Sequence, residues 1–269
     1  MLGASKEVEV SGPDANTNSG ANSAENSADE RAFLERYDAS VFEHPSVSVD
    51  VVLLTVRGGV LSALLLKRRE QPFKGAWSLP GGFVRMNESL DEAAARVLKD
   101  KARLESVYLE QLYTFGDVKR DPRTRVISVA HVALVEAARL EHVEQGEEVC
   151  LAQLVVDWKG EGGGPVRALS GNSAPLPLAF DHAHILGLAV RRLRGKLNYA
   201  PIGVQLLPPR FTLRQLQGVH ETILGRRLNK DSFRRRMLAS GQLSPVGARE
   251  EETQHRPAAL YTFVHPSAL

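Results

Sequence analysis

The segment 81–104, GGFVRMNESLDEAAARVLKDKARL, places chemically useful side chains at helical spacing. Ser89 and Glu92 have the spacing of a capping box, which predicts a helix over 89–102. Positions 97, 100 and 101 share or border one face of that helix, because they are spaced i, i+3 and i+4. Three carboxylates there would bind Mg²⁺, which could bridge a diphosphate and activate water. This chain instead has Val97, Asp100 and Lys101, whose formal charges sum to zero. The lysine would repel a divalent cation but could neutralise a bound phosphate.

Gly82, Glu88 and Arg96 have the spacing of a Nudix box, G-x5-E-x7-R-E-U-x-E-E-x-G-U, in which U is aliphatic. The chain departs from this frame after the arginine. Val97, Asp100 and Lys101 stand at the three following Glu positions, and Arg103 stands at the last Gly. The alternative is an ordinary amphipathic helix after a chance Gly-Gly pair, but the preceding PFKGAWSLPGGFV (72–84) also fits the family. The resemblance implies a scaffold that binds its ligand without cleaving it.

Length and composition limit the classes of protein to consider. The 269 residues suffice for two small domains, and 43% hydrophobic residues can form packed cores. No apolar run approaches the roughly 18 residues of a membrane span, and the N-terminus lacks the pattern of a signal peptide. The single Cys150 cannot form an intrachain disulfide. We expect it to be a buried strand residue of a cytoplasmic protein that binds no membrane.

The net charge of +2 conceals an asymmetry along the chain. Residues 1–180 carry 20 basic and 26 acidic side chains, whereas residues 181–269 carry 14 basic and 6 acidic ones. The two parts therefore have charges of −6 and +8. A basic C-terminal part suggests a polyanionic partner, although a solvated basic surface would have the same composition.

The N-terminal half has the pattern of a mixed sheet packed by helices. Residues 1–30 lack aromatic side chains and predict a disordered tail. Strands are expected over 47–57 and 60–68, joined by a hairpin turn at Gly58-Gly59, and over 107–115, 126–138 and 151–158. His131 lies within one of them, where a buried, hydrogen-bonded histidine is expected rather than a catalytic one. These elements define a first domain over 31–159.

Residues 160–179 are rich in Gly, Pro and Ser and predict a linker. Three helices are then expected: 182–196 after an Asp181 cap, 213–224 from a capping box at Thr212 to Gly225, and 230–240 after Asn229. A strand, a polar loop and a second strand follow. This order predicts a winged helix-turn-helix over 180–269.

The third of these helices has the features of a DNA-recognition helix. Phe233, Met237 and Leu238 should face the core, whereas Lys230, Arg234 and Arg235 should point outward near its N-terminal half. That half reaches base edges and phosphates in helix-turn-helix proteins, and a helix N-terminus favours phosphate. The alternative is a surface helix with a solvated arginine run.

The whole chain resembles the Nudix-related transcriptional regulators, often called NrtR, over about residues 45–265. The resemblance rests on 72–84, on FGDVKRDPRTRVISVAHVAL (115–134), on PLAFDHAHIL (177–186), on 211–243 and on HRPAALYTF (255–263). It implies an α+β fold, with a Nudix-type mixed-sheet α/β/α sandwich followed by a winged helix-turn-helix domain. It also implies a homodimer that binds double-stranded promoter DNA and senses ADP-ribose or a related NAD metabolite. No cofactor would be required, and Mg²⁺ would matter only for residual hydrolase activity.

The resemblance also assigns candidate residues. The LPGGF loop would lie against the ligand, and arginines, which suit phosphate oxygens, would contact its diphosphate and ribose. The ligand candidates are Arg68, Leu79, Gly81, Gly82, Phe83, Arg120, Arg123 and Arg125. The DNA candidates are Arg214, Lys230, Ser232, Arg234, Arg235 and Arg256. The family often has Lys-Arg-Asn where this chain has Lys230, Asp231 and Ser232, so we expect this chain to read a different operator.

Two other functions remain open at this point. The first is an ADP-ribose pyrophosphatase with an atypical metal site, which would use Glu88, Glu92 and Asp100 as displaced carboxylates. The second is an RNA- or protein-binding module that uses the basic domain. The altered box argues against the first, and the helix-turn-helix outline argues against the second. The sequence leaves the target genes and the direction of regulation undecided.

Overall fold

The computed structural model describes residues 19–141, 143, 148–197, 202–250 and 257–264. The chain divides into two compact units, Met1–His44 and Pro45–Leu269. In the first, helix α1 (Ser19–Arg36) precedes the short 3-10 helix η1 (Ala39–Val41). The predicted tail is therefore wrong for residues 19–30, which belong to α1, while residues 1–18 lie outside the described residues. An alanine- and glutamate-containing segment can form a helix without an apolar face.

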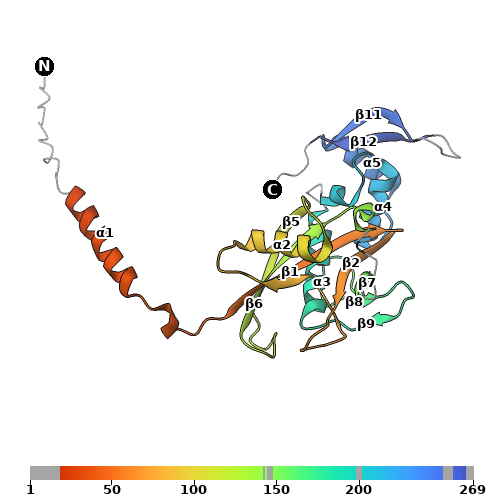
Figure 1. The fold of residues 1–269 in the computed structure, drawn as a ribbon. Helices are drawn as coiled ribbons and strands as arrows, with labels where there is room; N and C mark the ends of the chain where they lie inside the picture. The colour runs from red at the N-terminus through yellow and green to blue at the C-terminus, as the bar shows by residue number, and fades with distance from the viewer. Residues whose placement is uncertain (1–18, 142, 144–147, 198–201, 251–256, 265–269) are drawn as a thin grey trace, which may run out of the picture. The chain divides into compact units, whose positions relative to one another are not determined.

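A mixed nine-stranded sheet forms the centre of the second unit (Figure 1). Its order is β5-β6-β1-β2-β7-β8-β9, with β3 paired to β2 and β4 paired to β1. The pair β1 and β6 is parallel, and the other pairs are antiparallel. The strands are β1 (Ser46–Arg57), β2 (Val60–Lys67), β3 (Trp77–Ser78), β4 (Gly81–Phe83), β5 (Tyr108–Phe115), β6 (Val126–Leu134), β7 (Val149–Val155), β8 (Arg167–Leu169) and β9 (Pro175–Leu176).

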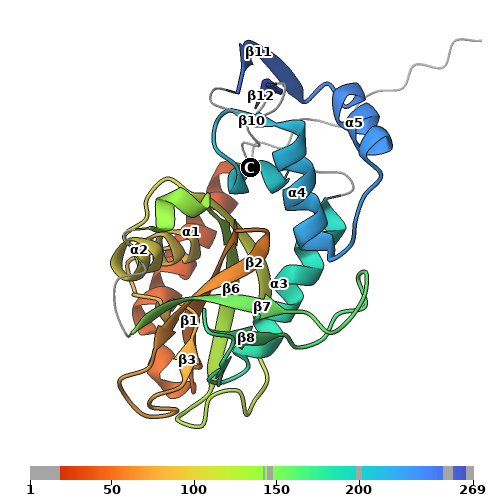
Figure 2. The same ribbon diagram turned by 90° about the vertical axis from the view of Figure 1, so that its right-hand side faces the viewer.

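The sheet lies between helices α2 (Leu90–Ala102) and α3 (His182–Lys196), as Figure 2 shows. Successive residues of β1 alternate between its two faces. Val51 and Leu53 pack with Val97 of α2, whereas Val52 and Leu54 belong to the core that includes Ile185 of α3. The 3-10 helix η2 (Ala137–Leu140) completes the α2 side, where Leu140 is buried. This is the predicted mixed sheet covered by helices on both faces.

The basic C-terminal part forms a winged helix-turn-helix. The 3-10 helix η3 (Ile202–Leu206) leads into β10 (Phe211–Thr212), α4 (Leu213–Leu224), α5 (Lys230–Ala239), β11 (Leu243–Arg249) and β12 (Ala259–Phe263). Strands β10, β12 and β11 form a small sheet in that order. Its core contains Phe211, Leu216, Phe233 and Tyr261.

Local signals in the sequence correctly predict where several elements begin or end. Capping boxes open α2 at Ser89 and α4 at Thr212, and Gly225 ends α4 in the left-handed conformation. Gly58 and Gly59 both have positive φ angles, 57° and 75°, in the turn between β1 and β2. The Asn229 side chain caps α5, as expected.

Two predictions of domain organisation are wrong. The predicted linker contains β8 and β9, which extend the main sheet, with Val166 and Ala168 buried. The helix over 182–196 packs against the sheet and also contacts α4, so it is not simply the first helix of the winged domain. Asp181 precedes this helix without forming a side-chain cap.

The single cysteine was expected to be buried in a strand. Cys150 lies in β7 but is only half-buried.

Candidate functional site

A cavity of about 570 Å³ opens beside the LPGGF loop. Its walls come from strands β1, β2, β3, β4 and β7, the loop after β5, the last turn of α2 and the start of α3. The structure brings together most of the predicted ligand residues, namely Arg68, Leu79, Gly81, Gly82, Phe83, Arg120 and Arg123. The remaining candidate, Arg125, does not line the cavity; its Nη1 donates to the Asp117 carbonyl at 3.1 Å.

The loop's first glycine is required by close packing. A Cβ at Gly81 would lie 2.4 Å from Asp50 Oδ1 and 2.9 Å from the Val49 carbonyl oxygen. At Gly82 the nearest atom would be Val97 Cγ2 at 3.5 Å, an ordinary contact. Gly81 therefore fits the loop tightly against β1, so that the loop's backbone forms a wall of the cavity.

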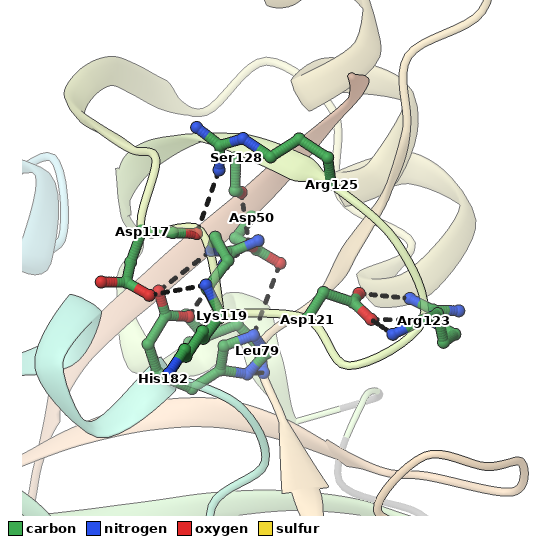
Figure 3. Close-up of polar contacts among 11 residues, drawn as sticks. Asp50, Leu79, Asp117, Lys119, Asp121, Arg123, Arg125, Ser128 and His182 are labelled. Carbon is green, nitrogen blue, oxygen red and sulfur yellow. Dashed lines mark hydrogen bonds and ion pairs between the residues drawn. The ribbon is translucent and has the colours of Figure 1, made fainter. Parts of the chain in front are cut away.

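A buried polar cluster lies behind this loop (Figure 3). Arg120 donates from Nε and Nη2 to the Asp181 carboxylate at 3.0 and 2.8 Å, and its Nη2 lies 3.5 Å from Asp50 Oδ2. The hydroxyl of Ser128 donates to Asp50 as well. Arg120 was expected to contact a ligand diphosphate. In the structure its charge is balanced by two carboxylates, so its principal contacts are within the protein.

His182 connects this cluster to the LPGGF loop. The Leu79 amide donates to His182 Nδ1 at 3.0 Å, so the neutral ring carries its proton on Nε2. That nitrogen lies 3.7 Å from Asp50 Oδ1. Burial lowers the pKa of His182, which favours the neutral ring further. The first residue of α3 is thus bonded directly to the loop that forms the cavity wall.

Two arginines at the cavity face aromatic rings. The Arg123 guanidinium lies 5.7 Å from the Phe83 ring centre and 6.0 Å from that of Phe180, and it donates to Asp121 at 2.7 Å. The Arg68 guanidinium lies 4.8 Å from the Phe180 ring centre. Burial, together with the nearby charge of Arg123, lowers the pKa of Arg68. Arg68 Nε donates to the Pro72 carbonyl at 2.7 Å. The arrangement suits an anion with a planar group.

Sequence reasoning did not assign Asp50, Phe180 or His182 to the site. All three line the cavity. Phe180 and His182 belong to the segment 177–186, on which the family resemblance partly rests. The resemblance therefore marked this segment, but neither residue was assigned to the ligand site. Phe180 also adopts a φ of +53°, a conformation that bulky residues rarely occupy and that concentrates at functional sites. Asp50 gave no signal, because a single acidic residue within an apolar strand has no distinguishing pattern.

The helix face that would hold a metal does not fit one. Val97 is buried, while Asp100 and Lys101 both line the cavity, so an ammonium group stands beside the one carboxylate. Glu88 accepts hydrogen bonds from Arg96, at 2.8 Å from Nε, and this bond lowers the pKa of Glu88 to about 2. Over the part of the chain that the structure describes, no group of three His, Cys, Asp or Glu could hold a metal ion.

Glu88 and Arg96 have a structural role instead. Arg96 Nη2 donates to the Phe83 carbonyl at 3.1 Å and Glu88 accepts from the Arg85 amide at 2.8 Å. The pair thus fastens the loop to α2. Arg103, at the box's last glycine position, ends α2 with a φ of +53°. The turn is therefore retained without glycine, at a cost on the order of 1 kcal/mol in backbone strain.

The predicted DNA-recognition residues of α5 are exposed. Lys230, Ser232, Arg234 and Arg235 are all accessible, as is Arg214 at the start of α4. Phe233 is buried and Met237 is half-buried, as expected, but Leu238 is 42% exposed and does not join the core. Arg256 lies outside the described residues. Asp231 is exposed in the first turn of α5, beside the basic side chains.

His131 is buried in β6, where its Nδ1 contacts the Val129 carbonyl at 3.2 Å. This agrees with the expected structural role.

Among the helices of the described residues, none has the length and apolar character needed to cross a membrane.

Comparisons with known proteins agree with this arrangement. Residues 44–160 match the family description "NUDIX domain", and residues 203–263 match "NrtR DNA-binding winged helix domain". The chain is 36% identical to the ADPR responsive transcriptional repressor NtrR of Acinetobacter baylyi, covering 88% of this chain and 90% of that protein. It is 31% identical to an ADP-ribose pyrophosphatase of Methanocaldococcus jannaschii, over 57% of this chain and 76% of that enzyme.

A solved structure extends the similarity to both domains. The crystal structure of Shewanella oneidensis NrtR complexed with a 27mer DNA is 32% identical to this chain, with a TM-score of 0.67. The match covers 81% of this chain and 93% of that one. The similarity therefore includes the sandwich, the winged helix and their connection.

Proposed function

Because the chain belongs to the NrtR family of Nudix-related transcriptional regulators, we propose that it binds promoter DNA in response to ADP-ribose or a related NAD metabolite. One observation carries this proposal. A single chain combines an arginine- and phenylalanine-lined cavity with a winged helix whose basic α5 side chains are exposed. The cavity suits a nucleotide-like anion, and the winged helix suits the phosphates and base edges of duplex DNA.

The effector site is proposed to use Arg68 and Arg123 for the diphosphate. A cavity of about 570 Å³ is of the size that holds small-molecule ligands. Titration calorimetry with ADP-ribose should show binding that Arg123→Ala weakens by roughly 10-fold or more, as expected for loss of a charged hydrogen bond of ~1.5–3 kcal/mol. Arg167→Ala is the matched control, because Arg167 forms a similar two-bond pair with Asp157 away from the cavity. Equal affinities for the two variants would contradict the assignment.

The DNA site is proposed to use Lys230, Arg234 and Arg235 of α5, with Arg214. We further propose a homodimer that binds two half-sites of a roughly palindromic operator, matching the protein's two-fold symmetry. Fluorescence anisotropy with promoter duplexes should show affinity that falls steeply with salt, because bound basic residues release counterions. Arg235→Ala should weaken binding, and Arg167→Ala should not. If both variants bind like the unaltered protein, the DNA-reading surface has been misassigned.

Binding of the effector is proposed to weaken DNA binding. A ligand shifts an equilibrium only through its different affinity for the two states. Coupling of about 1–3 kcal/mol would change DNA affinity by roughly 5- to 150-fold. By linkage, DNA must weaken ADP-ribose binding by the same factor. Anisotropy across an ADP-ribose titration tests this, and an unchanged DNA affinity at saturating ADP-ribose would exclude the sensor mechanism.

We also propose that the Nudix domain does not hydrolyse ADP-ribose at an enzymatic rate. The hydrolase alternative needs Glu88, Glu92 and Asp100 as metal ligands. Glu88 is held by Arg96, and Glu92 accepts from the Ser89 amide in the capping box. Assay of AMP release with Mg²⁺ present should stay well below about 1 per second. Turnover at or above that rate would restore the pyrophosphatase as the function.

A further inference from the structure

Helix α3 runs from the cavity to the DNA-binding domain. At its start, Asp181 is bonded to Arg120 and His182 to the Leu79 amide. Arg194 lies twelve residues after His182 on this helix, which corresponds to about 18 Å along the axis. A helix of this length is stiff, so a displacement of its first turn is passed to its last.

Arg194 is a buried arginine that binds three backbone carbonyls. Its Nε donates to the Ile223 carbonyl at 2.8 Å, and its Nη1 donates to the carbonyls of Trp158 and Gly160 at 3.2 and 3.0 Å. The guanidinium also lies 4.7 Å from the Trp158 ring centre. Only 5% of the residue is exposed, and burial lowers the pKa of its side chain. Burial of a charge is costly, and these hydrogen bonds offset that cost.

The bond to Ile223 joins α3 to the end of α4. The last carbonyls of a helix lack partners within the helix and attract a positive charge. Gly225, which ends α4, leaves room for the guanidinium, because a Cβ there would lie 3.2 Å from Arg194 Nη2. Arg194 thus fixes the end of the first helix of the helix-turn-helix.

The other connections between the two domains are less specific. Val219 and Ile223 join the apolar core beneath α3, but apolar contacts have no preferred direction and can slide. Thr222 donates one hydrogen bond to the Gly59 carbonyl, at 3.2 Å on an exposed surface. A cavity of about 870 Å³ lies beside this contact, between the β1–β2 turn and α4, and leaves space for α4 to move.

We propose that Arg194 is the positioning residue through which occupancy of the cavity changes the placement of α4 and α5 on DNA. This inference rests on the proposed function. A ligand that moves Arg120 or the Leu79 loop shifts Asp181 and His182, α3 moves as a rigid body, and Arg194 carries the Ile223 carbonyl with it. Arg194 is not among the residues that line the cavity, and it lies on α3 and not on α5.

The first test compares Arg194→Met and Arg194→Lys with Thr222→Val, which removes the hydrogen bond to the Gly59 carbonyl. DNA affinity is measured by anisotropy with and without saturating ADP-ribose, and ADP-ribose affinity by calorimetry. The unaltered protein and Thr222→Val should show the roughly 5- to 150-fold response. Arg194→Met should retain its affinities for DNA alone and for ADP-ribose alone, but ADP-ribose should change its DNA affinity by less than about 2-fold. In Arg194→Lys the change in DNA affinity should be intermediate. A full response in Arg194→Met would overturn the inference.

The second test leaves Arg194 in place, so it does not depend on the folding of a buried-charge variant. The chain has two tryptophans, Trp77 and Trp158. In a Trp77→Phe protein, Trp158 alone reports the junction through its contact with Arg194. ADP-ribose should change its emission, and addition of Arg123→Ala should shift this change to ADP-ribose concentrations roughly 10-fold higher or more. If calorimetry confirms that ADP-ribose binds but the Trp158 emission does not change, the inference is also overturned. Failure of the unaltered protein to bind ADP-ribose or DNA would instead refute the proposed function.

Discussion

Acid should destabilise the protein through one buried histidine of the DNA-binding domain. His220 lies in α4, where its ring packs against that of Phe233 at 5.1 Å, and its Nδ1 has no hydrogen-bond partner among the described residues. Burial, together with the positive charge of Arg236, lowers the pKa of His220 to about 4. In the unfolded chain this pKa is about 6.5. Protonation therefore favours the unfolded state across this interval.

The sign and size of the effect follow from these two pKa values. The unfolded chain takes up a proton as the pH falls below about 6.5, and the folded protein does so only near pH 4. The contribution of His220 to stability is complete above pH 6.5 and is lost as the pH falls toward 4. At ~1.36 kcal/mol per pKa unit, this amounts to roughly 2.5 kcal/mol at pH 4.5.

Urea unfolding of the full chain at pH 7.5 and 4.5, followed by circular dichroism, measures this loss. Other groups also titrate in this range, so the comparison needs a His220→Leu variant, which cannot gain the proton. The unaltered protein should lose roughly 2.5 kcal/mol more than the variant between the two pH values. If the two proteins lose the same free energy of unfolding, His220 is not a destabilising site and the argument fails.

Two further changes test local features of the fold. Gly81→Ala should abolish ADP-ribose binding in calorimetry while DNA binding without effector persists, because the new Cβ would collide with Asp50 and the Val49 carbonyl; unchanged ADP-ribose affinity would show that the loop has room to move. Thr212→Ala should lower the free energy of unfolding by about 1 kcal/mol, because it removes the hydroxyl that caps α4; a urea transition at the original midpoint would contradict this.

Local features of the sequence were sufficient to predict where several helices and the first hairpin begin and end. Capping residues such as Ser89 and Thr212, and the glycines at 58–59 and 225, act within a few residues of themselves. Their effects are therefore readable without the fold. The apolar spacing of 182–196 predicts a helix equally well, but periodicity does not say which surface the apolar face covers.

Tertiary structure determined what the sequence could not predict. The Gly- and Pro-rich segment before α3 forms β8 because its backbone pairs with β7, a long-range contact that composition does not reveal. Similarly, Arg120 fits the expected type for a phosphate ligand, yet the fold places Asp50 and Asp181 beside it. Arg123 also pairs with an acid, Asp121, but its side chain is 47% exposed, whereas that of Arg120 is 4% exposed. Arginines of the same type thus have different roles, which depend on their burial as well as on the acids near them.

The short turn between β1 and β2 carries a constraint on chain length. Surface hairpins ordinarily tolerate insertions and deletions, since their loops face solvent. Here the Gly59 carbonyl accepts the Thr222 hydroxyl, and the β1 residues before the turn alternate between two differently packed faces. An added residue in the turn would displace the Gly59 carbonyl from Thr222, and one added within β1 would exchange its two faces. We therefore expect natural variation in this hairpin to occur by substitution, with its length preserved.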